Sequence, residues 1–258
     1  DFLEYLGNDD KTKIIVAYLE GIKEGKRFYQ LAREISKQKP IVVWKGGATE
    51  SGARAAFSHT GKIAGSKNIW EAMFKQAGII SVSSFTEVMD CLLAFYYLPL
   101  PKGRRIAIVS GMGGTGVGTS DNCIELGLQV PKLTEETLKK LNQMLPPVGT
   151  APENPVDVGV AVLVGPHLYG EAIKILADDD NVDMLLAITP RNISCIQSIV
   201  DGAKGLSKPL VTSIYTLPEL ASQEYQIFAD NRIPAYSDAK KAAFALAKLA
   251  DYAEFVAL

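Results

Sequence analysis

Short apolar runs rich in β-branched residues alternate with segments of helical periodicity along most of this chain. The runs have the length and composition of buried strands. They are residues 13–19, 40–44, 79–82, 105–109, 128–130, 183–188, 209–214 and 234–236. The segments of helical spacing include residues 26–36, 68–76, 85–96 and 238–257. Such alternation is typical of parallel sheets with helices on both faces, so the expected fold class is α/β.

The alternation is interrupted at residues 98–103, where the sequence reads LPLPKG. Two prolines and a glycine so close together favour a linker between domains. We therefore expect a first domain at residues 1–98, a linker at 99–104 and a second domain of similar plan at 105–258. The chain opens at Asp1 on a helix-like segment rather than a strand. The first domain is accordingly expected to lack its N-terminal strand or strands, as part of a longer protein.

Composition excludes several classes of function. The 258 residues carry a net charge of −2, and 47% of them are hydrophobic. A nucleic-acid or membrane-surface partner would require a basic stripe, so neither partner is expected. No apolar run approaches the roughly 20 residues of a membrane span, and no signal peptide is evident. Three widely spaced cysteines (Cys91, Cys123 and Cys195) fit free thiols in a cytoplasmic protein, and two histidines leave no expected metal site.

The most distinctive segment is WKGGATESGARAAFSHTG at residues 44–61, which contains His59. It follows an apolar run, consists mainly of small residues and precedes a helix-like stretch. We interpret it as a loop whose histidine is accessible and lies beside a helix N-terminus, where anions are favoured. Such a histidine could carry a phosphoryl group. The alternative is an ordinary polar surface histidine.

A second glycine-rich segment, GMGGTG at residues 111–116, matches the pattern G-x-G-x-x-G between a strand and a helix expected from about residue 119. A dinucleotide site would also need an acidic residue after the next strand, but Pro131 and Lys132 stand there instead. The segment still predicts a more general anion site, in which backbone N–H groups at residues 110–118 face an anion. The alternative is a tight turn that only permits close packing. Residues 61–63 do not form a P-loop, because Ala56 and Ile63 replace its glycine and its Ser or Thr.

Glu20 ends the first apolar run, so its carboxylate is expected at the same sheet edge as the root of the histidine segment. It could accept a ring N–H of His59, or it could be an ordinary solvated glutamate. Other candidates carry weaker signals. Lys45, Arg54 and Lys62 flank the histidine segment, Asp157 could form a turn, a cap or part of a site, and His167 is interpreted as structural or superficial.

Taken together, residues 50–65, 110–118 and 154–157 resemble the acyl-CoA synthetases (NDP-forming), relatives of succinyl-CoA synthetase. The histidine segment is the most specific part of a resemblance that runs through nearly the whole chain. It implies two flavodoxin-like domains. It also implies that His59 takes the phosphoryl group and that Glu20 orients it. The phosphate-binding residues that follow are Ser58, Thr60, Gly61, Gly111, Gly113, Gly114 and Thr115.

The resemblance further implies a reversible reaction of acyl-CoA, phosphate and NDP to give acid, CoA and NTP. The family's CoA-binding and ATP-grasp domains have no counterpart in these residues. Mg-ATP or Mg-ADP and CoA are therefore expected to bind to those parts, on the same chain or another subunit, and an oligomer is expected. One rival is a catalytically silent module that senses acyl-CoA in a multidomain acyltransferase, and another is a plain interaction domain. Retention of the histidine, the glutamate and the glycines favours the enzyme.

Overall fold

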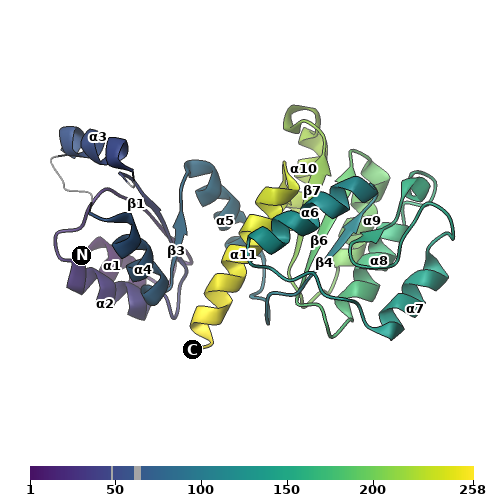
Figure 1. Ribbon diagram of the computed structural model, residues 1–258, viewed down its shortest axis with the longest axis horizontal. Helices are drawn as coiled ribbons and strands as arrows, with labels where there is room; N and C mark the ends of the chain where they lie inside the picture. The colour runs from purple at the N-terminus through teal and green to yellow at the C-terminus, as the bar shows by residue number, and fades with distance from the viewer. Residues whose placement is uncertain (48, 61–64) are drawn as a thin grey trace. The chain divides into compact units, whose positions relative to one another are not determined.

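The computed structural model describes residues 1–47, 49–60 and 65–258, without the side chains of Ala56, His59 and Thr60 (Figure 1). The chain divides into two compact units. The first comprises Asp1–Tyr96 together with Asp251–Leu258, and the second comprises Tyr97–Ala250. The domain boundaries expected from the sequence stay a prediction.

The first unit is built on a three-stranded parallel sheet in the order β1-β2-β3. Its elements are α1 (Phe2–Asn8), β1 (Ile15–Leu19), α2 (Gly25–Ile35), β2 (Ile41–Lys45), α3 (Glu50–Thr60), α4 (Lys67–Ala77), β3 (Ile79–Val82) and α5 (Phe85–Tyr97). Alternate strand residues such as Ile15, Ile41 and Val43 pack with Ala32 of α2 and Phe74 of α4 in one hydrophobic core. These helices therefore cover one face of the sheet and leave its carboxyl edge free for the segments that follow the strands.

The second unit contains a five-stranded parallel sheet in the order β5-β4-β6-β7-β8. Its elements are β4 (Ile106–Ser110), α6 (Gly113–Glu125), α7 (Glu135–Met144), β5 (Val156–Asp157), η1 (Val160–Leu163), α8 (Leu168–Ala177), β6 (Met184–Pro190), α9 (Ile193–Ala203), β7 (Leu210–Tyr215), η2 (Pro218–Leu220), α10 (Ser222–Asp230), β8 (Ala235–Tyr236) and α11 (Ala239–Val256). Numbered within the unit, this is the 2-1-3-4-5 order of flavodoxin-like folds. The predicted α/β fold class is confirmed.

Alternation along β4 shows how this sheet is covered. Ala107 and Val109 belong to a core that also holds Tyr169 and Ile173 of α8 and Ile196 of α9. The intervening positions of β4 point to the other face, on which α6 lies (Figure 1). The topological switch of such a sheet lies between its first and third strands, here β4 and β6, and ligands bind there at the carboxyl ends.

The strand expected at residues 128–130 is not formed. Gln129 makes a single parallel bridge to Arg105, and Leu128 instead donates to the Cys123 carbonyl at 2.9 Å, closing the end of α6. Pro131 has no N–H with which to continue a ladder. The segment therefore contributes a bridge rather than a strand.

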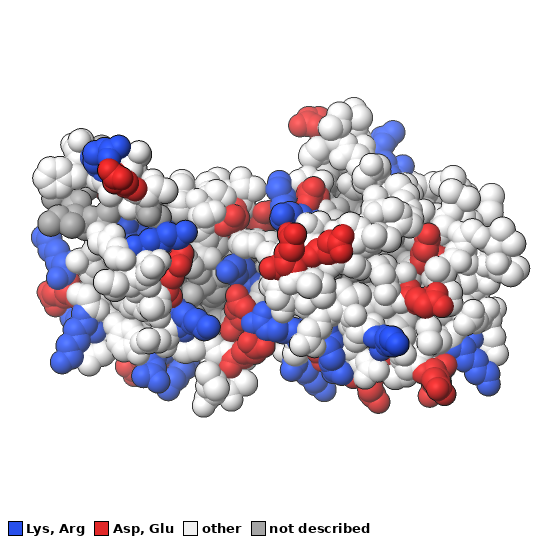
Figure 2. All heavy atoms as spheres, in the orientation of Figure 1, with Lys and Arg blue, Asp and Glu red and all other residues white. Residues whose placement is uncertain are grey.

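The surface charge, the hydropathy of the helices and the state of the cysteines bear on function. On the face drawn in Figure 2, Lys and Arg side chains are interspersed with Asp and Glu. Among the described helices, none combines the length and the apolar character that crossing a membrane would require. All three cysteines are buried and free.

Candidate active site

The carboxyl ends of β1 and β2 meet at one edge of the first sheet. Leu19 pairs with Lys45 in the parallel register, and the N–H of Gly46 donates to the Leu19 carbonyl at 2.9 Å. Glu20 follows Leu19 directly, and α3 begins a few residues after Lys45. The prediction that Glu20 and the root of the histidine segment share a sheet edge is confirmed.

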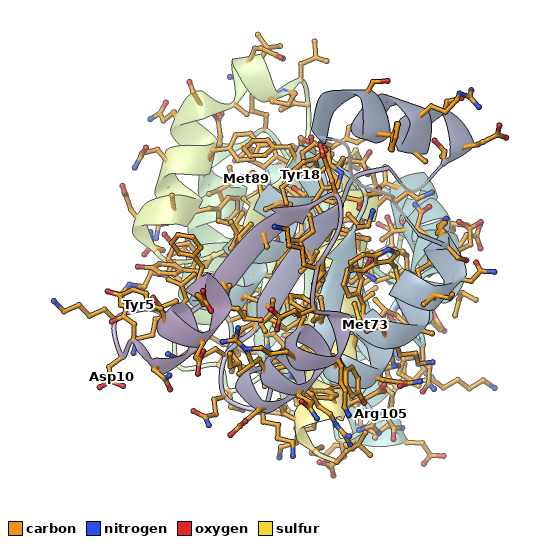
Figure 3. All side chains as sticks on the ribbon, turned by 90° about the vertical axis from the view of Figure 1, so that its left-hand side faces the viewer. Tyr5, Asp10, Tyr18, Met73, Met89 and Arg105 are labelled. Atoms are coloured by element: carbon orange, nitrogen blue, oxygen red, sulfur yellow. The ribbon has the colours of Figure 1, made fainter. Side chains whose placement is uncertain are left out.

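Tyr18 holds the Glu20 carboxylate in place. Its hydroxyl donates to Oε1 of Glu20 at 3.2 Å, and its ring meets Trp44 edge-on at 5.0 Å between centroids. Burial, with the neighbouring carboxylate, raises the pKa of Tyr18, so the phenol stays protonated as a donor. Figure 3 labels Tyr18 on edge strand β1. A Cβ at Gly46 would meet the Tyr18 hydroxyl, so a larger residue there would displace the exposed Tyr18 side chain from its place.

Lys45 places a positive charge at the same edge. Its ammonium lies 5.0 Å from the centroid of the Trp70 ring and donates to the Gly46 carbonyl. Burial lowers the pKa of Lys45, and the negative charge of Glu20 opposes that shift. The sequence did not reveal the roles of Tyr18 and Trp70, because both depend on the register of β1 and β2 and on the packing of α4.

The predicted loop around His59 is instead helical. Helix α3 spans Glu50–Thr60, and Thr49 caps its start by accepting from the N–H of Gly52 at 3.1 Å. His59 therefore lies within helix α3, nine residues after its first residue, Glu50, rather than in a loop. The alanines of this segment are the strongest helix formers, and they outweigh its glycine.

Other predicted residues of this segment have mixed outcomes. Arg54 donates to Glu50 at 2.6 Å and to Ser51 at 3.1 Å, so its charge is already partnered within α3. Ser58 is exposed, but a helical N–H donates to the carbonyl four residues earlier and is not free for phosphate. Gly61 and Lys62 lie outside the described residues, and so does the Thr60 side chain. The phosphate roles of Ser58, Thr60 and Gly61, and the role of His59, stay predictions.

The glycine-rich segment of the second unit forms a helix start rather than a long turn. Helix α6 begins at Gly113 with Met112 as its cap, six residues before the predicted start at Thr119. It follows β4 directly and therefore opens at the topological switch of the sheet. Its positive end and its first N–H groups point to the place where such folds bind anions.

Local hydrogen bonds decide which of these N–H groups can reach a ligand. The N–H of Gly111 donates to the Ile188 carbonyl at 3.4 Å, and that of Thr115 to the Met112 carbonyl at 3.1 Å. Within the described part of the chain, nothing accepts from the N–H groups of Gly113 or Gly114. These two donors are the ones that the helix start offers to an anion. Phosphate binding by Gly111, Gly113, Gly114 and Thr115 stays a prediction.

Asp157 has one of the roles that the sequence left open. Its Oδ1 accepts from the N–H of Gly159 at 2.8 Å, which makes it a turn former. Its Oδ2 lies against Gly113, where an added Cβ would approach it to 2.6 Å. A Cβ at Gly111 would likewise come within 2.7 Å of the buried Tyr169 hydroxyl. A side chain at Gly111 would therefore clash with the buried Tyr169, whereas one at Gly113 would displace the Asp157 carboxylate that lies beside the helix start.

Asn154 has a role that sequence reasoning missed. Its Oδ1 accepts from the N–H of Ile108 at 3.0 Å, and its Nδ2 donates to the carbonyls of Ile106 at 2.9 Å and Pro131 at 3.1 Å. The side chain thus pairs with β4 as a neighbouring strand would, and it fixes the segment that leads to Asp157. His167 occupies the N-cap position of α8, and its side chain makes no capping hydrogen bond.

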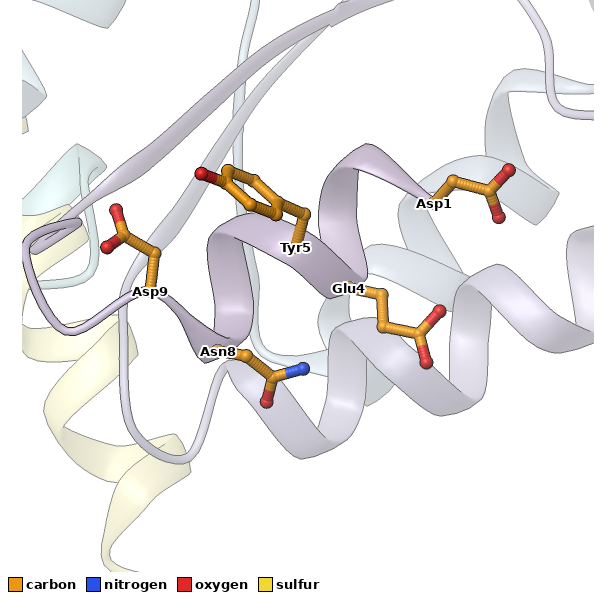
Figure 4. Close-up of a pocket in the computed structure, with 5 residues that line it drawn as sticks. All are labelled: Asp1, Glu4, Tyr5, Asn8 and Asp9. Carbon is orange, nitrogen blue, oxygen red and sulfur yellow. The ribbon is translucent and has the colours of Figure 1, made fainter.

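One hollow in the first unit does not fit a phosphate. It is lined by Asp1, Glu4, Tyr5, Asn8 and Asp9 (Figure 4), and its three carboxylates would repel an anion. In the described residues, no group of three or more His, Cys, Asp or Glu side chains is arranged to hold a metal ion.

Family profiles match both halves of the chain. The succinyl-CoA ligase like flavodoxin domain matches residues 1–95, and the Ligase-CoA domain matches residues 106–254. The chain belongs to the family of NDP-forming acyl-CoA synthetases. Membership agrees with the resemblance carried by residues 50–65, 110–118 and 154–157.

Individual members of this family align over nearly the whole chain. The chain is 37% identical to the α subunit of acetate–CoA ligase [ADP-forming] II of Pyrococcus furiosus, over 97% of its own length and 56% of the relative's. It is 34% identical to acetate–CoA ligase [ADP-forming] I of Archaeoglobus fulgidus, over 100% of its own length and 36% of the relative's. The chain thus spans about half, or less, of these synthetases.

A solved structure shows the same arrangement of elements. The dinucleotide-forming acetyl-coenzyme A synthetase 1 of Ca. Korarchaeum cryptofilum, described as a complex with phosphate and ADP, superposes with a TM-score of 0.89 at 32% identity. The alignment covers 99% of this chain and 56% of that one.

Proposed function

We propose that this chain is the phosphohistidine-carrying part of an ADP-forming acyl-CoA synthetase. The enzyme would interconvert acyl-CoA, ADP and phosphate with acid, CoA and ATP, using His59 as the phosphoryl acceptor. The observation that carries the proposal is the sheet edge at which Glu20, held by Tyr18, meets the root of the helix that contains His59. The names of the relatives support ADP as the nucleotide.

In the central step, a ring nitrogen of His59 attacks the phosphorus of an acyl phosphate. A P–N bond forms, the P–O bond to the acyl group breaks, and the carboxylate leaves with the electron pair. Glu20 would accept the N–H of the other ring nitrogen and hold the ring in one tautomer. The free N–H groups of Gly113 and Gly114 would bind the phosphate oxygens when the acyl phosphate is formed from acyl-CoA. The covalent intermediate lets one phosphoryl group serve two separate sites.

The remaining steps require parts beyond these residues. We propose that a CoA-binding domain and an ATP-grasp domain or subunit bind CoA and Mg-ATP or Mg-ADP, and that this chain binds neither tightly. The Pyrococcus relative is named as a subunit, whereas the Archaeoglobus relative aligns as 36% of a longer chain. Both arrangements are compatible with the proposal, and an oligomer is expected in the first.

The test is transfer of label from γ-³²P-ATP in the presence of the cognate ATP-grasp part. The label should be acid-labile and alkali-stable, as a phosphohistidine is, and should be absent in His59→Asn. His167→Asn is the matched control, because His59 and His167 are the only two histidines in the sequence. It should label as the unmodified protein does.

Two outcomes would contradict the proposal. Label that persists in His59→Asn would place the phosphoryl group elsewhere. An unlabelled wild-type chain, with an ATP-grasp part proven active on another substrate, would favour the sensing module instead.

A further inference from the structure

A cavity of about 530 Å³ opens along α6 in the second unit. It lies between one side of that helix, the carboxyl ends of β6 and β7, and the start of α11. Neither Gly113 nor Gly114 lines it, so it is distinct from the proposed phosphate site. Cavities of roughly 300–1,000 Å³ with apolar walls and a few polar groups are typical of small-molecule sites.

One buried hydroxyl of this cavity has no partner. Ser213 lies near the end of β7, lines the cavity and is only 3% exposed. In the part of the chain that the structure describes, nothing hydrogen-bonds its hydroxyl, and that oxygen is not among the atoms sealed off from solvent. The hydroxyl therefore faces the cavity. Because an unpaired buried polar group is costly, a ligand that hydrogen-bonds Ser213 is favoured.

Two further polar side chains of the lining are uncommitted. Asn122 on α6 and Thr216, directly after β7, are half-buried. Among residues 1–47, 49–60 and 65–258, none hydrogen-bonds the side chain of either. A carboxamide donates and accepts at once, which is how asparagine pairs with the amino group and the neighbouring ring nitrogen of adenine. The lining thus offers groups that read the edge of a base.

The apolar part of the lining suits a flat ring. Ile188 and Ile214 are buried at the bottom of the cavity, and the exposed ring of Tyr215 stands at its rim. A planar base can lie against the two aliphatic side chains and stack on the aromatic one, because every base has an apolar face. An open-chain ligand would leave the tyrosine ring without such a contact.

The charges of the lining disfavour a phosphorylated ligand. Asp238 follows β8 by two residues, and its carboxylate accepts only from the backbone N–H of Lys240, at 2.6 Å, among the described residues. The Lys240 ammonium lies 3.9 Å from the Glu125 carboxylate. Two carboxylates therefore stand against one ammonium. A carboxylate after a strand of an α/β sheet is also the group that binds ribose hydroxyls in dinucleotide-binding folds.

We infer that this cavity binds a neutral ribonucleoside, with adenine as its preferred base. Its volume equals the share of about 18 water molecules, and adenosine, with about 19 non-hydrogen atoms packed more closely than water, fits within it. Asn122 and Ser213 would bind the base, and Asp238 would accept from the ribose hydroxyls. This site is independent of the proposed phosphoryl transfer.

The test is photolabelling of the assembled enzyme with 2-azidoadenosine, which leaves the amino edge of the base unmodified. ADP is present to occupy the ATP-grasp part. The label should map by mass spectrometry to peptides of α6 or of residues 213–217. Adenosine should prevent labelling there. Inosine, which lacks the amino group, and AMP, which adds a charged phosphate, should each compete at least fivefold less well, the lower end for one bidentate pair.

Three variants assign the contacts. Ser213→Ala should weaken competition by adenosine about fivefold, the worth of one hydrogen bond, without lowering Tm, because the unliganded chain loses only an unpaired hydroxyl. Asn122→Ala should remove the preference for adenosine over inosine. Asn142→Ala, on the exposed surface of α7 and outside the cavity, is its matched control and should change nothing. Asp238→Asn should narrow the difference between adenosine and AMP.

Several outcomes would overturn the assignment. Labelling that is absent, or confined to the ATP-grasp part, would show that the cavity takes no nucleoside. Labelling at residues 213–217 that survives both Ser213→Ala and Asn122→Ala unchanged would mean adventitious surface labelling. Inosine or AMP competing as well as adenosine against the unmodified enzyme would refute the base or the charge preference.

Discussion

Replacing Asn154 with alanine should lower the stability of the second unit by more than most single substitutions do. The substitution removes three hydrogen bonds of 2.9–3.1 Å, two of them to Ile106 and Ile108, whose side chains and backbone are fully buried. Each bond is worth about 1 kcal/mol, and each buried backbone group left without a partner costs about 1–3 kcal/mol. We therefore expect a loss of about 3–4 kcal/mol, which for a unit of this size lowers Tm by roughly 6–16 °C.

The assay is calorimetry combined with amide exchange. The Ile108 N–H should exchange faster in Asn154→Ala, because its acceptor is gone. Fluorescence of Trp44 and Trp70 reports on the first unit alone, since both tryptophans lie there. Asn142→Ala is the matched control. Its side chain also donates to a backbone carbonyl, at 2.9 Å, but on an exposed helix surface, and it should change stability by less than about 0.5 kcal/mol.

A second variant separates the loss of donors from the loss of volume. Asn154→Asp keeps the acceptor for Ile108 but presents a carboxylate oxygen to the two carbonyls, so it should be at least as damaging as alanine. If Asn154→Ala unfolds within 0.5 kcal/mol of the unmodified chain, the argument that this side chain substitutes for a strand is wrong.

Three further outcomes are expected. Burial acts to raise the pKa of Asp183, but hydrogen bonds from Arg105 outweigh it and hold that pKa below its ordinary value. This pair's contribution is present above about pH 4 and lost below it, so Asp183→Asn should flatten the acid limb of an unfolding titration. Glu20→Gln should slow labelling of the histidine by about 10²–10⁴-fold with little change in stability, and equal rates would contradict its role. Burial raises the pKa of Cys123 to about 12, so the native thiol should not react with Ellman's reagent at pH 8.

The strands of this fold were predictable because a buried parallel strand leaves a strong local mark. Residues 79–82 and 105–109 are short, apolar and bounded by turn residues, and β3 and β4 fall on them within one residue. The starts of helices in segments of small residues were harder to predict. Glycine has low helix propensity, so residues 110–118 looked like a turn. The segment is helical from Gly113, and Gly116 has a packing reason, because a Cβ there would meet Pro155 at 3.2 Å.

The supporting contacts of the site could not be read from local sequence at all. Tyr18 reaches Glu20 two residues away, but its ring is placed by Trp44 on the neighbouring strand. Asn154 reaches β4 across 46 to 48 residues of chain. Such contacts depend on the register of strands that are distant in sequence, and no periodicity within one segment specifies that register.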